Sequence, residues 1–139
     1  MARHAWMLLA ALLLTGCAAA PKASLHDQLG AQAGIERLSA AIIVEVKADP
    51  RISGLFSETE AHYFRDRLVE FLCVVADGPC TYTGLPMTDA HSGMDISERE
   101  FNWFVEDTER AMAKLGLPLA VQNRLLARLA RMRGDVIRQ

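Results

Sequence analysis

The 139-residue sequence predicts an all-α fold. Three observations support this prediction. Apolar residues recur at three- and four-residue spacing in several segments, which is the period of one helix face. Ser, Pro and Gly occur where the helices would begin and end. No segment shows the sustained apolar–polar alternation of a strand, apart from a weak hint over Thr81–Thr83.

Five helices follow in chain order. A short helix has its N-cap at Ser24 and runs to Leu29, where Gly30 ends it. A second helix opens at Gly34 and stops at Asp49-Pro50. A third begins near Thr59. The apolar stripes of the second and third helices are Ile35, Leu38, Ile42 and Val46, and then Phe64, Leu68, Phe71, Leu72 and Val75.

A loop rich in Gly, Pro and Thr from Asp77 to Pro86 precedes the last two helices, and the short helical stretch Met87–His91 follows it. Ser97 and Glu100 form a capping box for the fourth helix. This helix runs to Gly116, and Pro118 starts the fifth. Their apolar faces are Phe101, Phe104 and Val105, and then Leu125, Leu126, Leu129 and Met132.

The composition excludes two broad classes of protein. Fifteen Lys+Arg against 17 Asp+Glu give a formal net charge of −2, whereas a protein that coats nucleic acid carries a basic excess. With 51% hydrophobic residues the chain has ample apolar surface to bury, which excludes gross disorder. The length predicts one domain with a short extension.

The N-terminus has the pattern of an export signal. The unbroken apolar run Ala5–Leu14 is too short to span a bilayer but fits the hydrophobic region of a signal peptide. Leu14-Thr15-Gly16-Cys17 then resembles the lipobox of bacterial lipoproteins, whose cysteine is acylated and becomes the new N-terminus. We expect a signal peptide over residues 1–16, a lipidated tether over residues 17–23 and one folded domain over residues 24–139. The alternative is an ordinary signal peptide with an incidental cysteine.

Acylation of Cys17 would place the protein at the cell envelope. Two or three acyl chains give stable anchoring, on the periplasmic face of a membrane in a Gram-negative host. Cys73 and Cys80 would then lie in an oxidising compartment. In one continuous helix they would be about 10 Å apart, but Asp77-Gly78-Pro79 should break the helix and let the chain fold back. A disulfide and two unpaired thiols both remain open.

Candidates for chemistry are few. No phosphate-binding loop or zinc-ligand spacing is present. His26 lies among polar residues and is expected to be solvated, and His62 lies away from its apolar stripe. His91 follows the Met87–Ala90 turn. A lone histidine beside apolar residues is more often structural, yet a neutral imidazole is also a good axial ligand for haem iron.

Several short runs share their order and spacing with one family. They are Leu29-Gly30 with Gly34-Ile35, Ala48-Asp49-Pro50-Arg51-Ile52, Leu55-Phe56-Ser57, Val69-Glu70-Phe71-Leu72, Gly78-Pro79-Cys80-Thr81-Tyr82-Thr83-Gly84, Pro86-Met87, Ala90-His91-Ser92-Gly93-Met94 and Ile96-Ser97. From Ser24 to about Asp135 the chain therefore resembles a group I truncated haemoglobin, the short globin with a two-over-two helical sandwich around a haem.

The resemblance implies one haem b per chain, with His91 as the proximal ligand of the iron. Phe56 would be wedged against the porphyrin. Arg67 could pair with a haem propionate or be solvated. The other implied haem contacts are the distal residues Ile43, Phe64, Leu68 and Leu72, and the residues around the macrocycle, Met87, Ile96, Phe101 and Phe104.

The chain departs from the family pattern on the distal side. The family commonly has a tyrosine at the position of Ile43 and often a polar residue at that of Leu68. Without a hydrogen-bond donor there, O₂ should dissociate quickly and the ferrous form should be five-coordinate. Two smaller departures are Ala31, where a second glycine is usual, and Thr88, where a basic residue is common.

The leading functional prediction is a lipid-anchored haem globin of the oxygen binding or transport type. It would bind O₂, NO or CO reversibly, contact a membrane but no nucleic acid, and depend on an unidentified reductase. An alternative is a haem enzyme, an NO dioxygenase or a peroxidase-like protein; the apolar distal set favours gas binding over turnover. A third class is a helical interaction lipoprotein that no longer holds haem.

Overall fold

The computed structural model describes residues 23–57 and 61–139. The expected signal peptide, the expected lipidation site Cys17, most of the expected tether and the predicted helix start near Thr59 lie outside the described residues. None of the helices in the described ranges is long and apolar enough to cross a membrane.

Six α-helices and two 3-10 helices make up the described chain. They are α1 (Leu25–Gln28), α2 (Ala31–Ala48), η1 (Ser53–Phe56), α3 (Ala61–Val75), α4 (Met87–Ala90), α5 (Glu98–Lys114), α6 (Leu119–Leu129) and η2 (Ala130–Asp135). The described residues contain no strand, including at Thr81–Thr83. The all-α prediction is confirmed. The predicted fifth helix, whose apolar face extended to Met132, ends as an α-helix at Leu129 and continues as the 3-10 helix η2.

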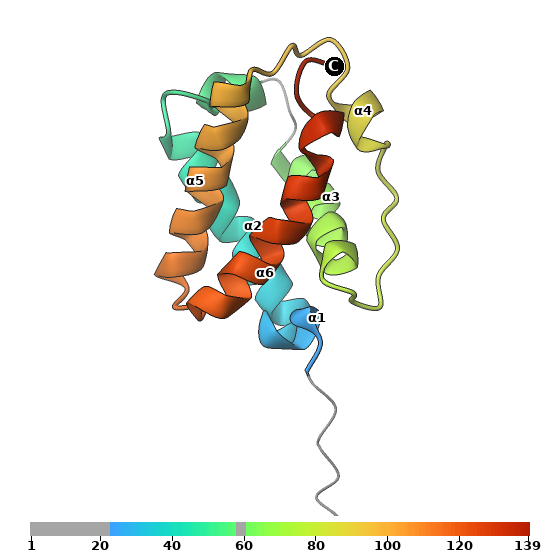
Figure 1. Ribbon diagram of the computed structural model, residues 1–139, viewed down its shortest axis with the longest axis vertical. Coiled ribbons are helices and arrows are strands. Elements are labelled where there is room, and N and C mark those ends of the chain that lie inside the picture. Colours follow the sequence, from blue (N-terminus) through green and yellow to red (C-terminus); the bar gives the residue numbers. More distant parts are fainter. Residues whose placement is uncertain (1–22, 58–60) are drawn as a thin grey trace, which may run out of the picture.

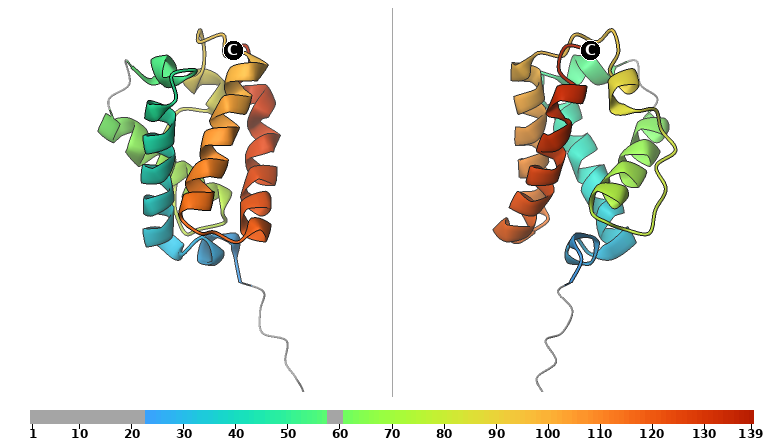
Figure 2. Two further views of the ribbon diagram at one scale, coloured as in Figure 1. Left: turned by 90° about the vertical axis from the view of Figure 1, so that its left-hand side faces the viewer. Right: turned by 45° about the vertical axis from the view of Figure 1, so that its right-hand side comes forward.

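The helices form two layers. Figures 1 and 2 show α5 and α6 in one layer and α2 and α3 in the other, with α2 packing against both α3 and α5. Fifteen buried residues form the core, namely Leu25, Leu29, Ile35, Leu38, Ile42, Val46, Ile52, Leu68, Leu72, Cys73, Ala76, Ala111, Met112, Val121 and Leu125. The apolar stripes predicted for the second and third helices lie in or against this core. The fourth helix differs from the prediction, because α5 contributes Ala111 and Met112 to the core while Phe101, Phe104 and Val105 are only half-buried.

The start of α2 differs from the prediction. Ser24 caps α1 through a capping box with Asp27, as its position suggested, but α2 begins at Ala31 and not at Gly34. Gly30 has φ +96° and turns the chain, and Ala31 follows with φ +53°, which is uncommon for a residue with a Cβ. Residue 34 lies in the first turn of α2 and is glycine, because a Cβ there would be 1.9 Å from the Leu29 carbonyl oxygen.

The start of α5 agrees with the prediction. The Ser97 backbone N–H and hydroxyl donate to Glu100 Oε2 at 2.8 and 2.6 Å, and the Glu100 N–H donates to the Ser97 hydroxyl oxygen at 3.3 Å. These hydrogen bonds from Ser97 lower the pKa of the Glu100 carboxyl. This capping box fixes the residue at which the segment after α4 ends and α5 begins.

Charged residues connect α2 with α5 beside the core. The buried Asp49 carboxylate accepts from Arg51 Nε at 2.9 Å and Nη2 at 2.6 Å, and this pairing lowers the pKa of Asp49. Arg110 on α5 reaches Asp49 at 3.5 Å and Glu45 at 3.6 Å, and Lys114 also pairs with Glu45. The interface is therefore set by directional contacts as well as by apolar packing.

Candidate functional site

His91 is the C-cap residue of the short helix α4 and is half-buried. Its Nδ1 lies 2.7 Å from the carbonyl oxygen of Met87, one turn earlier. A carbonyl oxygen can only accept a hydrogen bond, so Nδ1 carries the proton. In a neutral imidazole, Nε2 then keeps its lone pair and is the nitrogen available to a metal.

Aromatic side chains from three elements meet near the end of the molecule where α4 lies. The ring of Phe56 in η1 lies 5.1 Å from that of Phe64 on α3 and 6.4 Å from that of Phe104 on α5. All three rings are half-buried although they are large and apolar. Figure 1 shows η1, α4 and the first turns of α3 and α5 at this same end.

The other predicted haem contacts divide by burial. Half-buried residues are Ile43 on α2, Met87 on α4 and Phe101 on α5. Buried residues are Leu68, Leu72 and Ile96, with 8%, 1% and 7% of their surface exposed. Leu68 and Leu72 lie on one face of α3 and also belong to the core, so the expected distal wall is continuous with it. The role of each residue toward haem stays a prediction.

Arg67 takes part in a polar cluster between α3 and the loop over residues 77–86. Its Nη2 lies 2.8 Å from Glu70 Oε1, and its Nη1 contacts the Thr83 hydroxyl. Its guanidinium also lies 5.6 Å from the ring of Tyr63, which is 51% exposed and so directed outward. The expected pairing of Arg67 with a propionate stays a prediction.

Glu70 fastens the middle of the loop to α3. Its Oε2 accepts from the Thr83 backbone N–H at 2.9 Å and from the Thr83 hydroxyl at 3.0 Å. The backbone hydrogen bond is the main reason that the pKa of Glu70 lies below its ordinary value. Sequence reasoning missed this contact, because a Glu and a Thr thirteen residues apart give no signal until the loop's path is known.

The start of the same loop is fastened covalently. Cys73 on α3 and Cys80 form a disulfide with a Cα–Cα distance of 6.0 Å. The helix ends before Asp77, which has φ +61°, so the chain turns back as the sequence suggested.

His26 was expected to be solvated but is 8% exposed, because its backbone N–H donates to the Ala76 carbonyl and docks α1 onto the end of α3.

This combination fits a haem. An iron porphyrin requires one oriented imidazole nitrogen and a flat apolar slot. The Met87 carbonyl orients His91, and the large apolar side chains of η1, α3 and α5 are incompletely covered by other protein groups. Incomplete cover of three neighbouring phenylalanines is the property expected where an apolar group completes the packing.

Comparison with known proteins supports this interpretation. The family model of the bacterial-like globins matches residues 24–138. The group 1 truncated hemoglobin GlbN of Mycolicibacterium paratuberculosis is 28% identical over 117 residues, which are 84% of this chain and 86% of that protein. GlbN of a Nostoc species is 27% identical over 114 residues, covering 82% of this chain and 97% of the relative.

Solved structures share the fold. The Fe(III) form of the truncated hemoglobin of Tetrahymena pyriformis has a TM-score of 0.82 and 25% identity, with 84% of this chain and all of that chain covered. The 2/2 hemoglobin of a Synechococcus species, solved with covalently attached heme, has a TM-score of 0.78 at 20% identity, covering 83% and 98%. The chain therefore belongs to the bacterial-like globin family, and its relatives are group 1 truncated hemoglobins.

Proposed function

We propose that the protein holds one haem b per chain through His91 and binds O₂ or another diatomic gas reversibly at the cell envelope. One observation carries the proposal, namely the 2.7 Å hydrogen bond between His91 Nδ1 and the Met87 carbonyl. It leaves Nε2 as the free nitrogen and fixes the plane of the ring. The haem, when bound, supplies the iron to which the gas binds.

The distal residues favour binding over turnover. The expected wall of Ile43, Phe64, Leu68 and Leu72 has no hydrogen-bond donor in its side chains. Tyr63, a side chain near the start of α3 that could donate, is half exposed and lies against Arg67. A gas on this side would receive no hydrogen bond from the wall, so O₂ should leave quickly. Oxidation of NO to nitrate needs O₂ to be retained, and this wall does not favour that.

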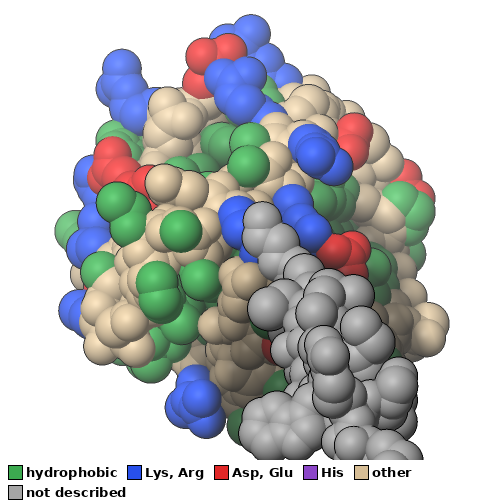
Figure 3. All heavy atoms as spheres, turned by 60° about the horizontal axis from the view of Figure 1, so that its bottom comes forward, with side chains coloured by type: hydrophobic (Ala, Val, Ile, Leu, Met, Phe, Trp, Pro, Cys, Tyr) green, Lys and Arg blue, Asp and Glu red, His purple; other side chains and the backbone are tan. Residues whose placement is uncertain are grey.

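The fold is also compatible with an anchor at the N-terminus. The described chain begins at Ala23 beside α1, at the end of the molecule opposite α4 (Figure 1). The turn between α5 and α6 lies at the same end and exposes Leu115 and Leu119, 39% and 70% accessible, next to Lys114. Figure 3 shows hydrophobic and basic side chains on this face. Apolar and cationic groups are those that favour an anionic lipid surface, so a lipid on Cys17 would direct the α4 end away from the membrane.

Haem binding is tested first on residues Ser24–Gln139 produced with haem supplied. The parent should show a Soret absorption band, and the His91→Gly variant should lose it and regain it when free imidazole is added. The His62→Gly variant serves as the control and should keep the band. Absence of a Soret band in the parent would refute haem binding itself.

Two further experiments address function and location. Mixing the oxygenated protein with NO and measuring nitrate separates gas binding from dioxygenation; sustained nitrate production with a reductant would favour the enzyme. Labelling cells with a fatty acid should mark the full chain but not its Cys17→Ser variant. An unlabelled parent would contradict the lipid anchor without affecting the haem proposal.

A further inference from the structure

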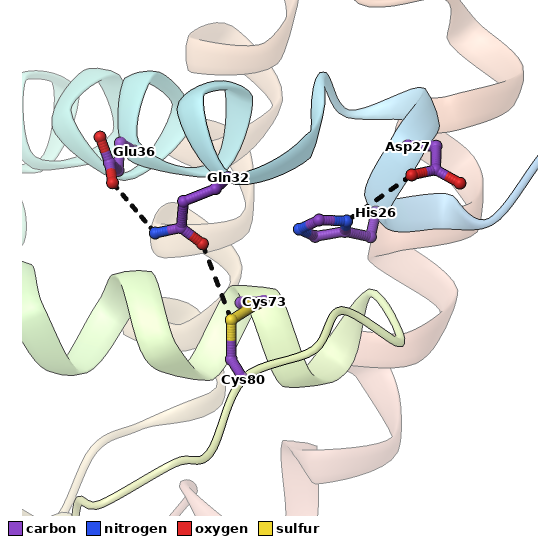
Figure 4. Close-up of a disulfide and its surroundings, with 6 residues drawn as sticks. All are labelled: His26, Asp27, Gln32, Glu36, Cys73 and Cys80. Atoms are coloured by element: carbon purple, nitrogen blue, oxygen red, sulfur yellow. Dashed lines mark hydrogen bonds and ion pairs between the residues drawn. A yellow bond between two sulfur atoms is a disulfide. The ribbon is translucent and has the colours of Figure 1, made fainter.

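We propose that Cys73–Cys80 is a redox-active disulfide that exchanges with a dithiol, with His26 as the acid–base group beside Cys73. This proposal does not depend on haem. It rests on the groups that surround the two sulfur atoms in the angle between α1, α2 and the end of α3 (Figure 4).

The first observation concerns His26. Its ring extends from α1 toward the disulfide (Figure 4), and a Cβ placed on Gly78 would lie 2.6 Å from both His26 Cδ2 and Cys73 Sγ. The imidazole and the sulfur therefore flank the same small volume, which is free because residue 78 is glycine. His26 Nε2 is buried and has no hydrogen-bond partner within the described part of the chain. An unpaired buried nitrogen is costly, whereas the thiol of a reduced Cys73 would be a donor for it.

The second observation concerns Gln32. Its Oε1 lies 3.7 Å from Cys80 Sγ, while its Nε2 donates to Glu36 Oε1 at 3.0 Å. The bond to Glu36 fixes the orientation of the amide, so the carbonyl oxygen faces the sulfur. A disulfide sulfur has no hydrogen to donate to that oxygen, but the thiol of a reduced Cys80 has one. Cys80 Sγ thus lies beside an acceptor that only the reduced form can use, while Cys73 Sγ and the His26 ring flank the same small volume at Gly78.

The accessibility of the sulfurs sets the order of events. Cys73 is fully buried, whereas Cys80 is half-buried in the loop. A thiolate of the dithiol attacks Cys80 Sγ, the S–S bond breaks, and its electron pair goes to Cys73 Sγ. A proton carried on His26 Nε2 passes to this leaving thiolate, and the nitrogen is then the acceptor for the Cys73 thiol. The second thiol of the reagent then attacks the reagent's sulfur atom in the mixed disulfide. This releases Cys80 as a thiolate, which takes a proton from water. The chain gains two thiols and the reagent becomes a disulfide.

The test uses the full chain in detergent with dithiothreitol as the dithiol, and it is run with and without haem. The second-order rate constant for reduction is measured by trapping the thiols with iodoacetamide and determining the mass of the protein by mass spectrometry. General acid catalysis predicts that His26→Gln reduces this constant about tenfold or more. The matched control His62→Gln should leave it unchanged. An equal rate constant in His26→Gln and in the parent would refute the role of His26.

A second measurement needs no variant. The ¹⁵N resonance of His26 Nε2 should shift when the disulfide is reduced at constant haem content, because a thiol becomes its hydrogen-bond partner. The Nε2 resonance of His62 in the same sample is the internal reference. An unmoved His26 resonance would show that reduced Cys73 does not bind this nitrogen and would overturn the proposal.

Discussion

The two sides of the candidate haem site are held by different forces. The loop that leads to His91 is fastened by directional contacts, namely the Cys73–Cys80 disulfide, the Glu70–Thr83 hydrogen bonds and the His91–Met87 hydrogen bond. The expected distal wall on α2 and α3 is held by apolar packing and is continuous with the core. A ligand atom must be aimed, which requires directional contacts, whereas a wall needs only shape.

Removing the Cys73–Cys80 disulfide should have the largest effect on the loop that leads to His91. Replacing both Cys73 and Cys80 by serine should lower the free energy of unfolding by about 2.5 kcal/mol, because the unfolded chain gains freedom when this short loop opens. Urea unfolding of the haem-free domain measures the change. Cys80→Ser alone should cost about as much, since either substitution breaks the bond. An unchanged urea midpoint would show that the loop is held without the disulfide.

A polar group on the expected distal wall should slow the dissociation of O₂. Leu68→Gln places a donor on the α3 wall, and one hydrogen bond to the gas is worth about 1.4 kcal/mol or less. O₂ dissociation measured by stopped flow should slow by up to about tenfold. Leu68→Met keeps the volume without adding a donor and should leave the rate nearly unchanged. Equal rates in the glutamine and methionine variants would mean that Leu68 does not face the gas.

The turn between α1 and α2 lies outside both sides of the candidate haem site. A substitution there should have a smaller effect on the free energy of unfolding. Ala31 is exposed and has φ +53°, so Ala31→Gly should raise the free energy of unfolding by about 1 kcal/mol by relieving backbone strain. Ala33→Gly, in the same helix but without a positive φ, should instead lower it by about 0.5–1 kcal/mol. Thermal unfolding of the two variants distinguishes these signs. A loss of stability in both would contradict the strain at Ala31.

The smallest expected effect is on the stability of the protein at acid pH. The pKa of Glu70 is lowered in the folded state, so its contribution to stability is complete above the ordinary value of 4.5 and is lost as the pH falls through the lowered pKa. Glu70→Gln should make unfolding less sensitive to pH below 4.5 and should speed amide exchange at Thr83. Glu109→Gln, on the exposed face of α5, should do neither. Unchanged exchange at Thr83 in the Glu70 variant would show that this contact does not hold the loop.

Local patterns predicted much of this structure. The N-cap at Ser24, the capping box at Ser97 and the helix breaks around Gly30 and Pro118 depend on neighbouring residues, so the sequence could place them. The family resemblance singled out His91, which the structure places with its Nδ1 bonded to Met87.

Contacts between distant segments could not be predicted in this way. The burial of His26 depends on Ala76, and the anchoring of Thr83 depends on Glu70. The pairing of Cys73 with Cys80 stayed open because it depends on the path of the loop. The early start of α2 was missed because Ala31 adopts a backbone conformation that its side chain disfavours.

In the proposed haem site, His91 supplies one axial ligand to the iron and the distal wall supplies none. The absorption spectrum of the ferrous, haem-loaded domain without added gas reports this coordination. A five-coordinate ferrous spectrum is the predicted result, because Ile43, Phe64, Leu68 and Leu72 have no atom that can ligate iron. A six-coordinate ferrous spectrum would contradict the account, since a side chain other than these four would then occupy the distal position.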